Sequence, residues 1–157
     1  SLHDALPIYA GAVIRFDDRW QGTVEENLAD SIGDFVLRRA DGFWAYQIAV
    51  VVDDADQRVS DVVRGADLLE STARQIYLQR LLGLPTPRYL HVPVVVNQLG
   101  EKLSKQTGAI ALDRSKPVEE LMLAARRLGL ELRPASGSLQ DFWDAALPAW
   151  ARRFGND

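Results

Sequence analysis

The sequence predicts an α/β fold followed by a short helical tail. Two segments rich in β-branched residues, at 59–63 and 89–96, lie on either side of a segment with clear helix end signals. Strands alternating with helices are typical of α/β proteins. The end of the chain, from about residue 113, shows two amphipathic helical patterns and no strand pattern. We therefore expect one sheet-containing region and then helices.

The first half of the chain contains one turn and one ambiguous segment. Residues 35–37 are apolar and precede Asp41-Gly42, a pair typical of tight turns, so a short strand and a turn are predicted. The segment 45–54 is continuously apolar in its middle and fits either a strand or a buried helix. The run at 59–63 predicts a short strand.

The helix in "STARQIYLQRLLGLP" has signals at both ends. Thr72 and Gln75 are spaced as a capping box, Gly83 is a C-terminal stop, and Pro85 prevents continuation. The run "YLHVPVVV" at 89–96 predicts a buried strand that leads into the next loop.

The tail predicts two helices. The first begins with Pro117 and ends before Gly129, and the second begins at Ser138, with Asp141 three residues later and a kink expected at Pro148. The predicted apolar face of the first helix consists of Val118, Leu121, Met122, Ala125 and Leu128. The predicted buried residues of the second are Leu139, Phe142, Trp143, Ala146, Leu147 and Trp150.

Composition excludes several classes of protein. The 157 residues include 22 acidic and 18 basic side chains, no cysteine, and no apolar run as long as a bilayer span. A membrane protein, a disulfide-stapled protein and a protein with a broad nucleic-acid footprint are therefore not expected. Local basic pairs at 126–127 and 152–153 leave room for a limited RNA contact. We expect a cytoplasmic protein.

The first residues, "SLHDALPIYA", contain neither an initiator methionine nor the features of a secretory signal. They read like a translated sequencing adapter joined to a truncated reading frame. We expect residues 1–8 not to be native sequence.

The stretch "GEKLSKQTG", residues 100–108, surrounds a serine with two lysines inside a loop bounded by glycines. Lysine is a compact charge on a flexible stem, suited to following phosphate oxygens during a reaction, and glycines allow such a loop to move. A solvated turn is the commoner explanation of this pattern. The pattern alone leaves both possibilities open.

A longer stretch bears on this choice. The segment "VVRGADLLESTARQIYLQRLLGLPTPRYLHVPVVVNQLGEKLSKQ" resembles the second half of the catalytic domain of class I glutamyl-type aminoacyl-tRNA synthetases. The resemblance implies the C-terminal half of a Rossmann-like catalytic domain over 11–112 and a short helical tail over 113–157. It also favours a helix for 45–54. The segment "GDFVLRRADGFWAYQIAVVVDD" and the short tail are most similar to the branch that glutamylates queuosine in tRNA(Asp).

The resemblance implies a role for individual residues. Tyr46 matches a tyrosine whose hydroxyl contacts glutamate, and Arg64 matches an arginine that pairs with a glutamate carboxylate. Lys105 matches a catalytic, ATP-contacting lysine with Lys102 as a weaker companion. The implied ATP-binding loop is Lys102, Leu103, Ser104, Lys105 and Gln106.

Each assignment has a structural alternative. Tyr46 could be a core residue, Arg64 could pair with Asp61 or Asp67 at the surface, and Lys105 could be a solvated charge. His91, on an apolar strand, is interpreted as structural. The adjacent carboxylates at 53–54 are interpreted as a cap and turn, so no metal ligand is predicted.

The sequence also departs from the family. The "HIGH"-type motif and further glutamate contacts of the family's N-terminal half are absent from this chain, and a zinc site would be possible only in that half. Arg58 stands where the family usually has glycine, so that turn is expected to be strained or reshaped. We expect a fragment that is inactive alone.

The implied reaction uses ATP and Mg²⁺ to activate L-glutamate, which is then transferred to queuosine in the anticodon loop of tRNA(Asp). A monomer is expected. Two alternatives stay open: a fragment of an ordinary glutamyl-tRNA synthetase, and a noncatalytic RNA- or partner-binding module.

Overall fold

The computed structural model describes residues 12–31, 34–97, 99–104, 108–109 and 111–155. The chain forms two compact units, one ending at Val92 and the other beginning at Pro93, and each is described separately. The resemblance implies a domain boundary at 112–113, which need not coincide with the border between compact units at 92–93. The boundary at 112–113 stays a prediction. The α/β class predicted from the sequence is confirmed by the mixed sheet and helices of the first unit.

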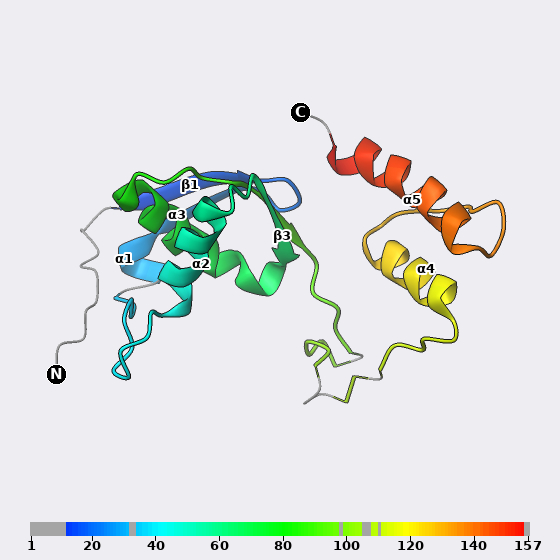
Figure 1. Ribbon diagram of the computed structural model, residues 1–157, viewed down its shortest axis with the longest axis horizontal. Helices are drawn as coiled ribbons and strands as arrows, with labels where there is room; N and C mark the ends of the chain where they lie inside the picture. The colour runs from blue at the N-terminus through cyan, green and yellow to red at the C-terminus, as the bar shows by residue number, and fades with distance from the viewer. Residues whose placement is uncertain (1–11, 32–33, 98, 105–107, 110, 156–157) are drawn as a thin grey trace. The chain divides into compact units, whose positions relative to one another are not determined.

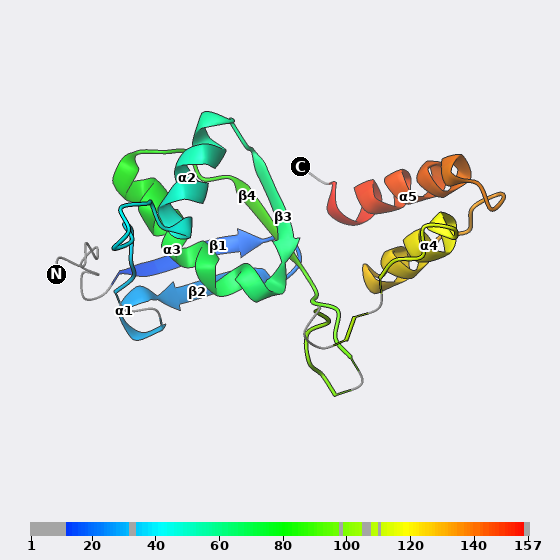
Figure 2. The ribbon, with the colours of Figure 1, turned by 60° about the horizontal axis from the view of Figure 1, so that its bottom comes forward.

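The first unit contains a four-stranded sheet in the order β2-β1-β4-β3 (Figures 1 and 2). The strands are β1 (Val13–Asp18), β2 (Gly22–Asn27), β3 (Asp61–Gly65) and β4 (Arg88–Val92). β1 and β2 form an antiparallel hairpin, whereas β4 runs parallel to both β1 and β3. The carboxyl ends of β1, β4 and β3 therefore meet at one edge of the sheet.

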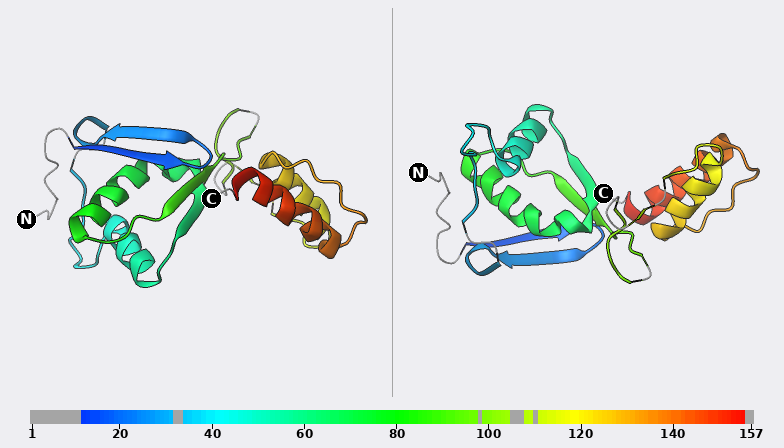
Figure 3. Two further views of the ribbon diagram at one scale, coloured as in Figure 1. Left: turned by 90° about the horizontal axis from the view of Figure 1, so that it is seen from above. Right: turned by 90° about the horizontal axis from the view of Figure 1, so that it is seen from below.

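Two long helices cover the same side of this sheet. α3 (Leu69–Leu82) packs against β1, and α2 (Tyr46–Asp56) packs on α3, so that α3 lies between α2 and the hairpin in both views of Figure 3. Two short helical segments, α1 (Leu28–Ser31) and the 3₁₀ turn η1 (Ala66–Leu68), complete the unit. The core between α3 and the sheet consists of Ile14, Leu28, Ala73, Ile76, Tyr77 and Tyr89.

The helix favoured for 45–54 is confirmed as α2, and the strand predicted at 59–63 is confirmed with its position shifted to β3. The strand predicted at 89–96 ends at Val92, because Pro93 cannot donate to a sheet ladder. The turn at Asp41-Gly42 is confirmed, with Gly42 at φ 88°, but the flanking residues form only an isolated bridge between Arg38 and Trp44. The hairpin of β1 and β2 was not predicted.

The capping box predicted at Thr72 and Gln75 is wrong. α3 begins at Leu69, a turn earlier, and both side chains are buried inside the helix at 0% and 2% exposure. The predicted stop is confirmed, because Gly83 ends α3 in the left-handed conformation at φ 65°. Arg58 is also left-handed, at φ 56°, a conformation that glycine adopts more readily than arginine, which confirms the expectation of strain.

The second unit is built around α4 (Pro117–Arg127) and α5 (Leu139–Phe154), as predicted. Pro117 occupies the first helical turn of α4, and the Ser138 hydroxyl caps α5 by accepting from the backbone N–H of Asp141 at 3.1 Å. α5 continues through Pro148. Buried residues from both helices and their connection form the core: Ala125, Leu130, Phe142 and Ala146.

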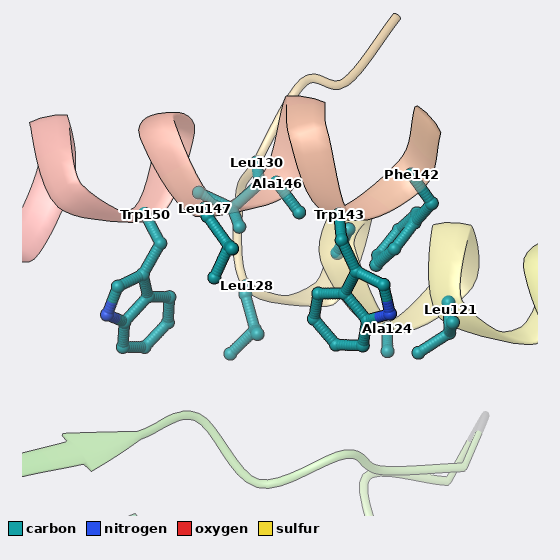
Figure 4. Close-up of a pocket in the computed structure, with 10 residues that line it drawn as sticks. Leu121, Ala124, Leu128, Leu130, Phe142, Trp143, Ala146, Leu147 and Trp150 are labelled. Carbon is teal, nitrogen blue, oxygen red and sulfur yellow. The ribbon is translucent and has the colours of Figure 1, made fainter. Parts of the chain in front are cut away.

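Part of the predicted buried face of α5 is wrong. Leu139, Trp143 and Leu147 are 46%, 45% and 61% exposed, because α4 covers only the side of α5 that carries Phe142 and Ala146. Trp143 and Leu147 instead line an apolar groove with Trp150 and residues of α4 and its C-terminal loop (Figure 4). None of the helices in the described ranges is long and apolar enough to cross a membrane.

Candidate functional site

The carboxyl edge of the parallel strands carries three chemically active side chains. Asp18 is the last residue of β1, His91 lies near the end of β4, and Arg64 lies near the end of β3. The register pairs Arg64 with His91. In open α/β sheets, ligands bind outside the carboxyl ends of the strands, so this edge is the natural place for a site.

The guanidinium of Arg64 is held by three side chains. Its Nε donates to Nε2 of His91 at 3.0 Å, and its Nη2 donates to Oγ1 of Thr72 at 2.8 Å and to Oε1 of Gln75 at 2.7 Å. The ring of Tyr89 lies 5.6 Å below the guanidinium carbon. These contacts fix the plane of a side chain that is otherwise long and flexible.

The alternative in which Arg64 forms a surface ion pair with Asp61 is wrong. Asp61 lies at the opposite end of β3 and pairs there with Arg19 at 3.4 Å and Arg88 at 2.9 Å. The hydrogen bond from Arg88, together with Ser60, lowers the pKa of Asp61. One strand thus places an arginine at its carboxyl end and an acid between arginines at its amino end.

His91 is completely buried beside Arg64. Its Nδ1 lies 2.6 Å from Oδ2 of Asp18, and its Nε2 also lies 3.0 Å from the hydroxyl of Thr72. Burial lowers the pKa of His91, and the positive charge of Arg64 acts in the same direction, against the raising effect of Asp18. The predicted structural residue is therefore part of the cluster that holds Arg64.

Asp18 is anchored by backbone donors. Its Oδ1 accepts from the N–H groups of Trp20 at 3.0 Å and Gln21 at 2.8 Å, and both of its oxygens lie within 3.2 Å of the N–H of His91. Burial acts to raise the pKa of Asp18, but the hydrogen bonds from Gln21, His91 and Trp20 outweigh it and the pKa is lowered. Asp18 is therefore a buried, ionised carboxylate.

The network extends to the start of α2. Gln75, which accepts from Arg64, donates to Oε1 of Gln47 at 2.9 Å, and Gln47 donates to the hydroxyl of Ser71 at 3.2 Å. Tyr46 precedes Gln47 as the first residue of α2 and is 54% exposed, so the core alternative for Tyr46 is wrong. The two predicted glutamate-binding residues thus belong to elements that one chain of hydrogen bonds connects.

Sequence reasoning missed most of this network. Asp18 gave no local signal, since its side-chain partner His91 is 73 positions away and its nearby donors, at residues 20 and 21, are backbone N–H groups. A signal did exist in α3, where Thr72, Gln75 and Gln79 repeat at helical spacing and lie on the buried face. Three polar residues on the apolar side of a helix indicate a buried polar network better than a cap.

The lysine loop begins as a short hairpin in the second unit. Val96 and Lys102 form an antiparallel bridge, the side chain of Asn97 accepts from the N–H groups of Leu99 and Glu101, and Gly100 adopts φ 79°. Lys102 and Leu103 are exposed, and Ser104 is half-buried. Lys105 and Gln106 lie outside the described residues.

The described part of the chain contains no group of three or more His, Cys, Asp or Glu side chains able to hold a metal ion. Asp53 and Asp54 lie in the last turn of α2, where their backbone carbonyls accept from the N–H groups of Gln57 and Val59 at 2.9 Å. The cap-and-turn interpretation of this pair fits that position.

Comparison with known structures supports the fold. The crystal structure of a glutamate-tRNA synthetase from Elizabethkingia anophelis superposes with a TM-score of 0.66 at 21% identity, covering 90% of this chain and 33% of that one. A glutamate tRNA ligase from Elizabethkingia meningosepticum, in complex with its amino acid, gives a TM-score of 0.67 at the same identity and coverage. At this identity the likeness concerns the fold.

Sequence comparison is more specific. A protein of Ralstonia nicotianae named glutamyl-Q tRNA(Asp) synthetase is 68% identical over 148 residues, or 94% of this chain and 46% of that protein. A protein of the same name from Janthinobacterium sp. is 66% identical over 144 residues, 92% of this chain and 49% of its own length. The chain thus spans about half the length of these curated relatives.

The family described as "tRNA synthetases class I (E and Q), catalytic domain" matches residues 8–134, which cover α2, the whole sheet, the Arg64 network and α4. The chain belongs to this family of class I aminoacyl-tRNA synthetase catalytic domains.

Proposed function

We propose that this chain is part of an enzyme that activates L-glutamate with ATP and transfers it to the queuosine base of tRNA(Asp). The observation that carries this proposal is Arg64, which the structure holds at the carboxyl edge of the sheet with three side-chain hydrogen bonds. A fixed, permanently charged donor at a ligand-binding edge is suited to a carboxylate substrate.

Arg64 would bind a carboxylate of glutamate through the part of its guanidinium that faces away from the network. Within the described residues, the hydrogen bonds recorded for Arg64 use Nε and Nη2, which leaves the N–H groups of Nη1 for a substrate. Tyr46, exposed at the start of α2, would add a hydroxyl contact to the same substrate. Arginine and tyrosine together give one charged and one neutral contact.

The lysine loop would supply positive charge to the phosphates. Attack of the glutamate carboxylate on the α-phosphorus of ATP brings two anions together, so cations that are already in position lower the barrier. We assign Lys105 as the main contact with ATP, with Lys102 and the loop through Gln106 as companions. Mg²⁺ would accompany ATP and add positive charge at the phosphates.

The choice of acceptor rests on the relatives. The two bacterial proteins at 66% and 68% identity carry tRNA(Asp) in their names, which favours queuosine in that tRNA over the 3′ end of tRNA(Glu). The same names and the intact Arg64 network disfavour a noncatalytic binding module. The reaction needs ATP and tRNA, and we therefore also propose a cytoplasmic location.

The test uses a chimera in which residues 12–155 of this chain replace the matching segment of the Ralstonia nicotianae relative. The chimera is given radiolabelled glutamate, ATP and one of three acceptors: tRNA(Asp) from queuosine-replete cells, tRNA(Asp) from cells unable to make queuosine, and tRNA(Glu). We expect labelling of the first acceptor alone.

Equal labelling of the two tRNA(Asp) pools would exclude queuosine as the acceptor. Preferential charging of tRNA(Glu) would identify an ordinary glutamyl-tRNA synthetase. A chimera that is folded by circular dichroism, yet labels none of the three, would favour the noncatalytic module. The unmodified Ralstonia protein, assayed in parallel, is the positive control.

A further inference from the structure

We propose that Asp18 and His91 are positioning residues, in which Asp18 fixes the tautomer of His91 and His91 in turn holds Arg64 as a hydrogen-bond acceptor. One part of the inference rests on the proposed function: that the fixed Arg64 serves to bind a substrate carboxylate. The hold itself follows from the hydrogen bonds.

The guanidinium determines the protonation of His91. Arginine only donates hydrogen bonds, so the 3.0 Å contact from Nε of Arg64 requires a lone pair on Nε2 of His91. The single ring proton must then lie on Nδ1, where it is donated to Asp18 at 2.6 Å. His91 is therefore neutral, with the proton on Nδ1, and the low pKa produced by burial agrees with this state.

Asp18 can hold that tautomer because it cannot move. Both the Asp18 and His91 side chains are 0% exposed, and backbone donors at residues 20, 21 and 91 fix the carboxylate. An ionised carboxylate accepts only, so a ring nitrogen that faces it must carry a proton. The negative charge of Asp18 thereby keeps the ring proton on Nδ1 and leaves Nε2 of His91 unprotonated toward Arg64.

The same cluster leaves Arg64 little rotational freedom. The two acceptors of α3, Thr72 and Gln75, take both protons of Nη2, while His91 takes the proton of Nε. Three acceptors from two elements define the guanidinium plane, and the only terminal nitrogen that they leave is Nη1. Arg64 is thus oriented before any substrate binds, which reduces the entropy lost on binding.

Asp18→Asn is the most informative substitution. The amide oxygen would keep the backbone donors at Oδ1, which places the amide NH₂ against Nδ1 of His91. A donor at that position requires Nδ1 to accept, so the ring proton would move to Nε2 and oppose the N–H of Arg64. The volume of the side chain is almost unchanged, and the hydrogen bond from Nε of Arg64 to His91 is lost while those to Thr72 and Gln75 are kept.

The test is nitrogen-15 NMR of the full chain without ligand. The chain has two histidines, so the spectrum of His91→Gln identifies the His91 ring signals. In the wild type we expect a protonated Nδ1 and an unprotonated Nε2. In Asp18→Asn we expect the two to exchange roles and the Nε–H of Arg64 to exchange with solvent about tenfold faster or more, as for loss of a charge-assisted hydrogen bond.

Asp61→Asn is the matched control, because Asp61 is an acid on the same sheet that contacts Arg19 and Arg88 at the other end of β3. This substitution should leave the protonation of the His91 ring nitrogens and the solvent exchange rate of the Arg64 Nε–H as in the wild type. His91→Gln should also retain protection of the Arg64 Nε–H, since a glutamine Oε1 can accept at the position of Nε2, whereas His91→Phe should lose it.

A wild-type His91 protonated on Nε2 or on both nitrogens would overturn the inference, and so would full Arg64 protection in folded His91→Phe. The wild-type signals of His91 can also be identified with His3→Gln, so a position-91 variant that fails to fold leaves the inference testable. None of these signals depends on glutamate. Failure of the tRNA assay would therefore reject the proposed function and leave the tautomer standing, while the wrong tautomer would reject this inference alone.

Discussion

Two regions of the chain, the Arg64 network in the first unit and the α4–α5 groove in the second, place opposite kinds of side chain in opposite environments. In the first unit the polar groups of Asp18, Thr72, Gln75 and His91 are at most 3% exposed and bond to one another and to Arg64. In the second unit large apolar side chains such as Trp143 and Leu147 are 45% and 61% exposed along a groove.

The difference shows where geometry is specified. A buried polar network has few alternative arrangements, because each unsatisfied group costs free energy, so it holds Arg64 in one orientation. An open apolar groove has no such directional bonds and specifies shape only weakly. A residue that must meet a substrate at a fixed angle therefore belongs in the first kind of environment.

The largest expected effect is on stability. Asp18→Ala should lower the free energy of unfolding by on the order of 3 kcal/mol, because several buried donors lose their acceptor together. Trp143→Ala should cost only about 1 kcal/mol, since almost half of this side chain is already in water. Urea unfolding followed by circular dichroism measures both. Equal losses would break the contrast between the two units.

The next effect concerns the lysine loop. In the chimera, Lys105→Ala should lower the rate of adenylate formation by roughly 10²-fold, as for one preorganised electrostatic donor, with a smaller effect for Lys102→Ala. The KM for glutamate should stay nearly unchanged. Lys116→Ala, which removes a lysine that pairs with Glu119 at the start of α4, is the matched control.

Single-turnover glutamate-dependent exchange of pyrophosphate into ATP measures this rate. We predict no exchange by this chain alone, which spans about half the length of its curated relatives, because in-line geometry needs every group of a site in position. A near-normal rate for Lys105→Ala would show that the loop is a solvated turn.

A smaller effect is expected with pH. The folded-state pKa of His91 lies below 6.5, so below that pH the unfolded chain binds a proton that the folded chain excludes, and acid favours unfolding. Asp18, with a folded pKa below 3.8, adds stability above that value that is lost as the pH falls further. Both groups therefore destabilise the fold in acid.

His91→Gln should remove the first of these losses. Between pH 7 and about 5, the unfolding free energy of the wild type should fall more steeply than that of the variant, by up to about 1.4 kcal/mol per pH unit. Denaturant titrations at several pH values measure the two slopes. The other histidine of the chain is present in both proteins, so identical slopes would show that His91 keeps its ordinary titration.

Local signals predicted much of the fold. Gly83 and Ser138 lie at the helix ends that their chemistry indicates. The strain at Arg58 was expected from the resemblance and not from a local signal. The hairpin of β1 and β2 was missed, because β2 carries a single large apolar residue, Val24, and β1 ends in two aspartates, so neither strand shows an apolar run. The exposed groove was missed because periodicity identifies the apolar face of α5 and not how much of it a neighbour covers.

The site was predictable only in part. Arg64 and Tyr46 were identified through a resemblance, whereas the network around Arg64 combines residues of α3, β4 and β1. Two of its members, Asp18 and His91, are 73 positions apart. Pairing over such distances depends on the strand order, which no local pattern of Asp18 or His91 encodes. Thr72 and Gln75 were noticed for their spacing but assigned to a cap.

The central claim is that Arg64, held by this network, binds glutamate. The most direct measurement is the glutamate dependence of pyrophosphate exchange by the chimera and by its Arg64→Lys variant, with Arg88→Lys as the matched control. Lysine keeps the charge but lacks the planar fork that engages His91, Thr72 and Gln75. We predict a KM for glutamate at least about tenfold higher in Arg64→Lys, with kcat much less affected. An unchanged KM would contradict the claim.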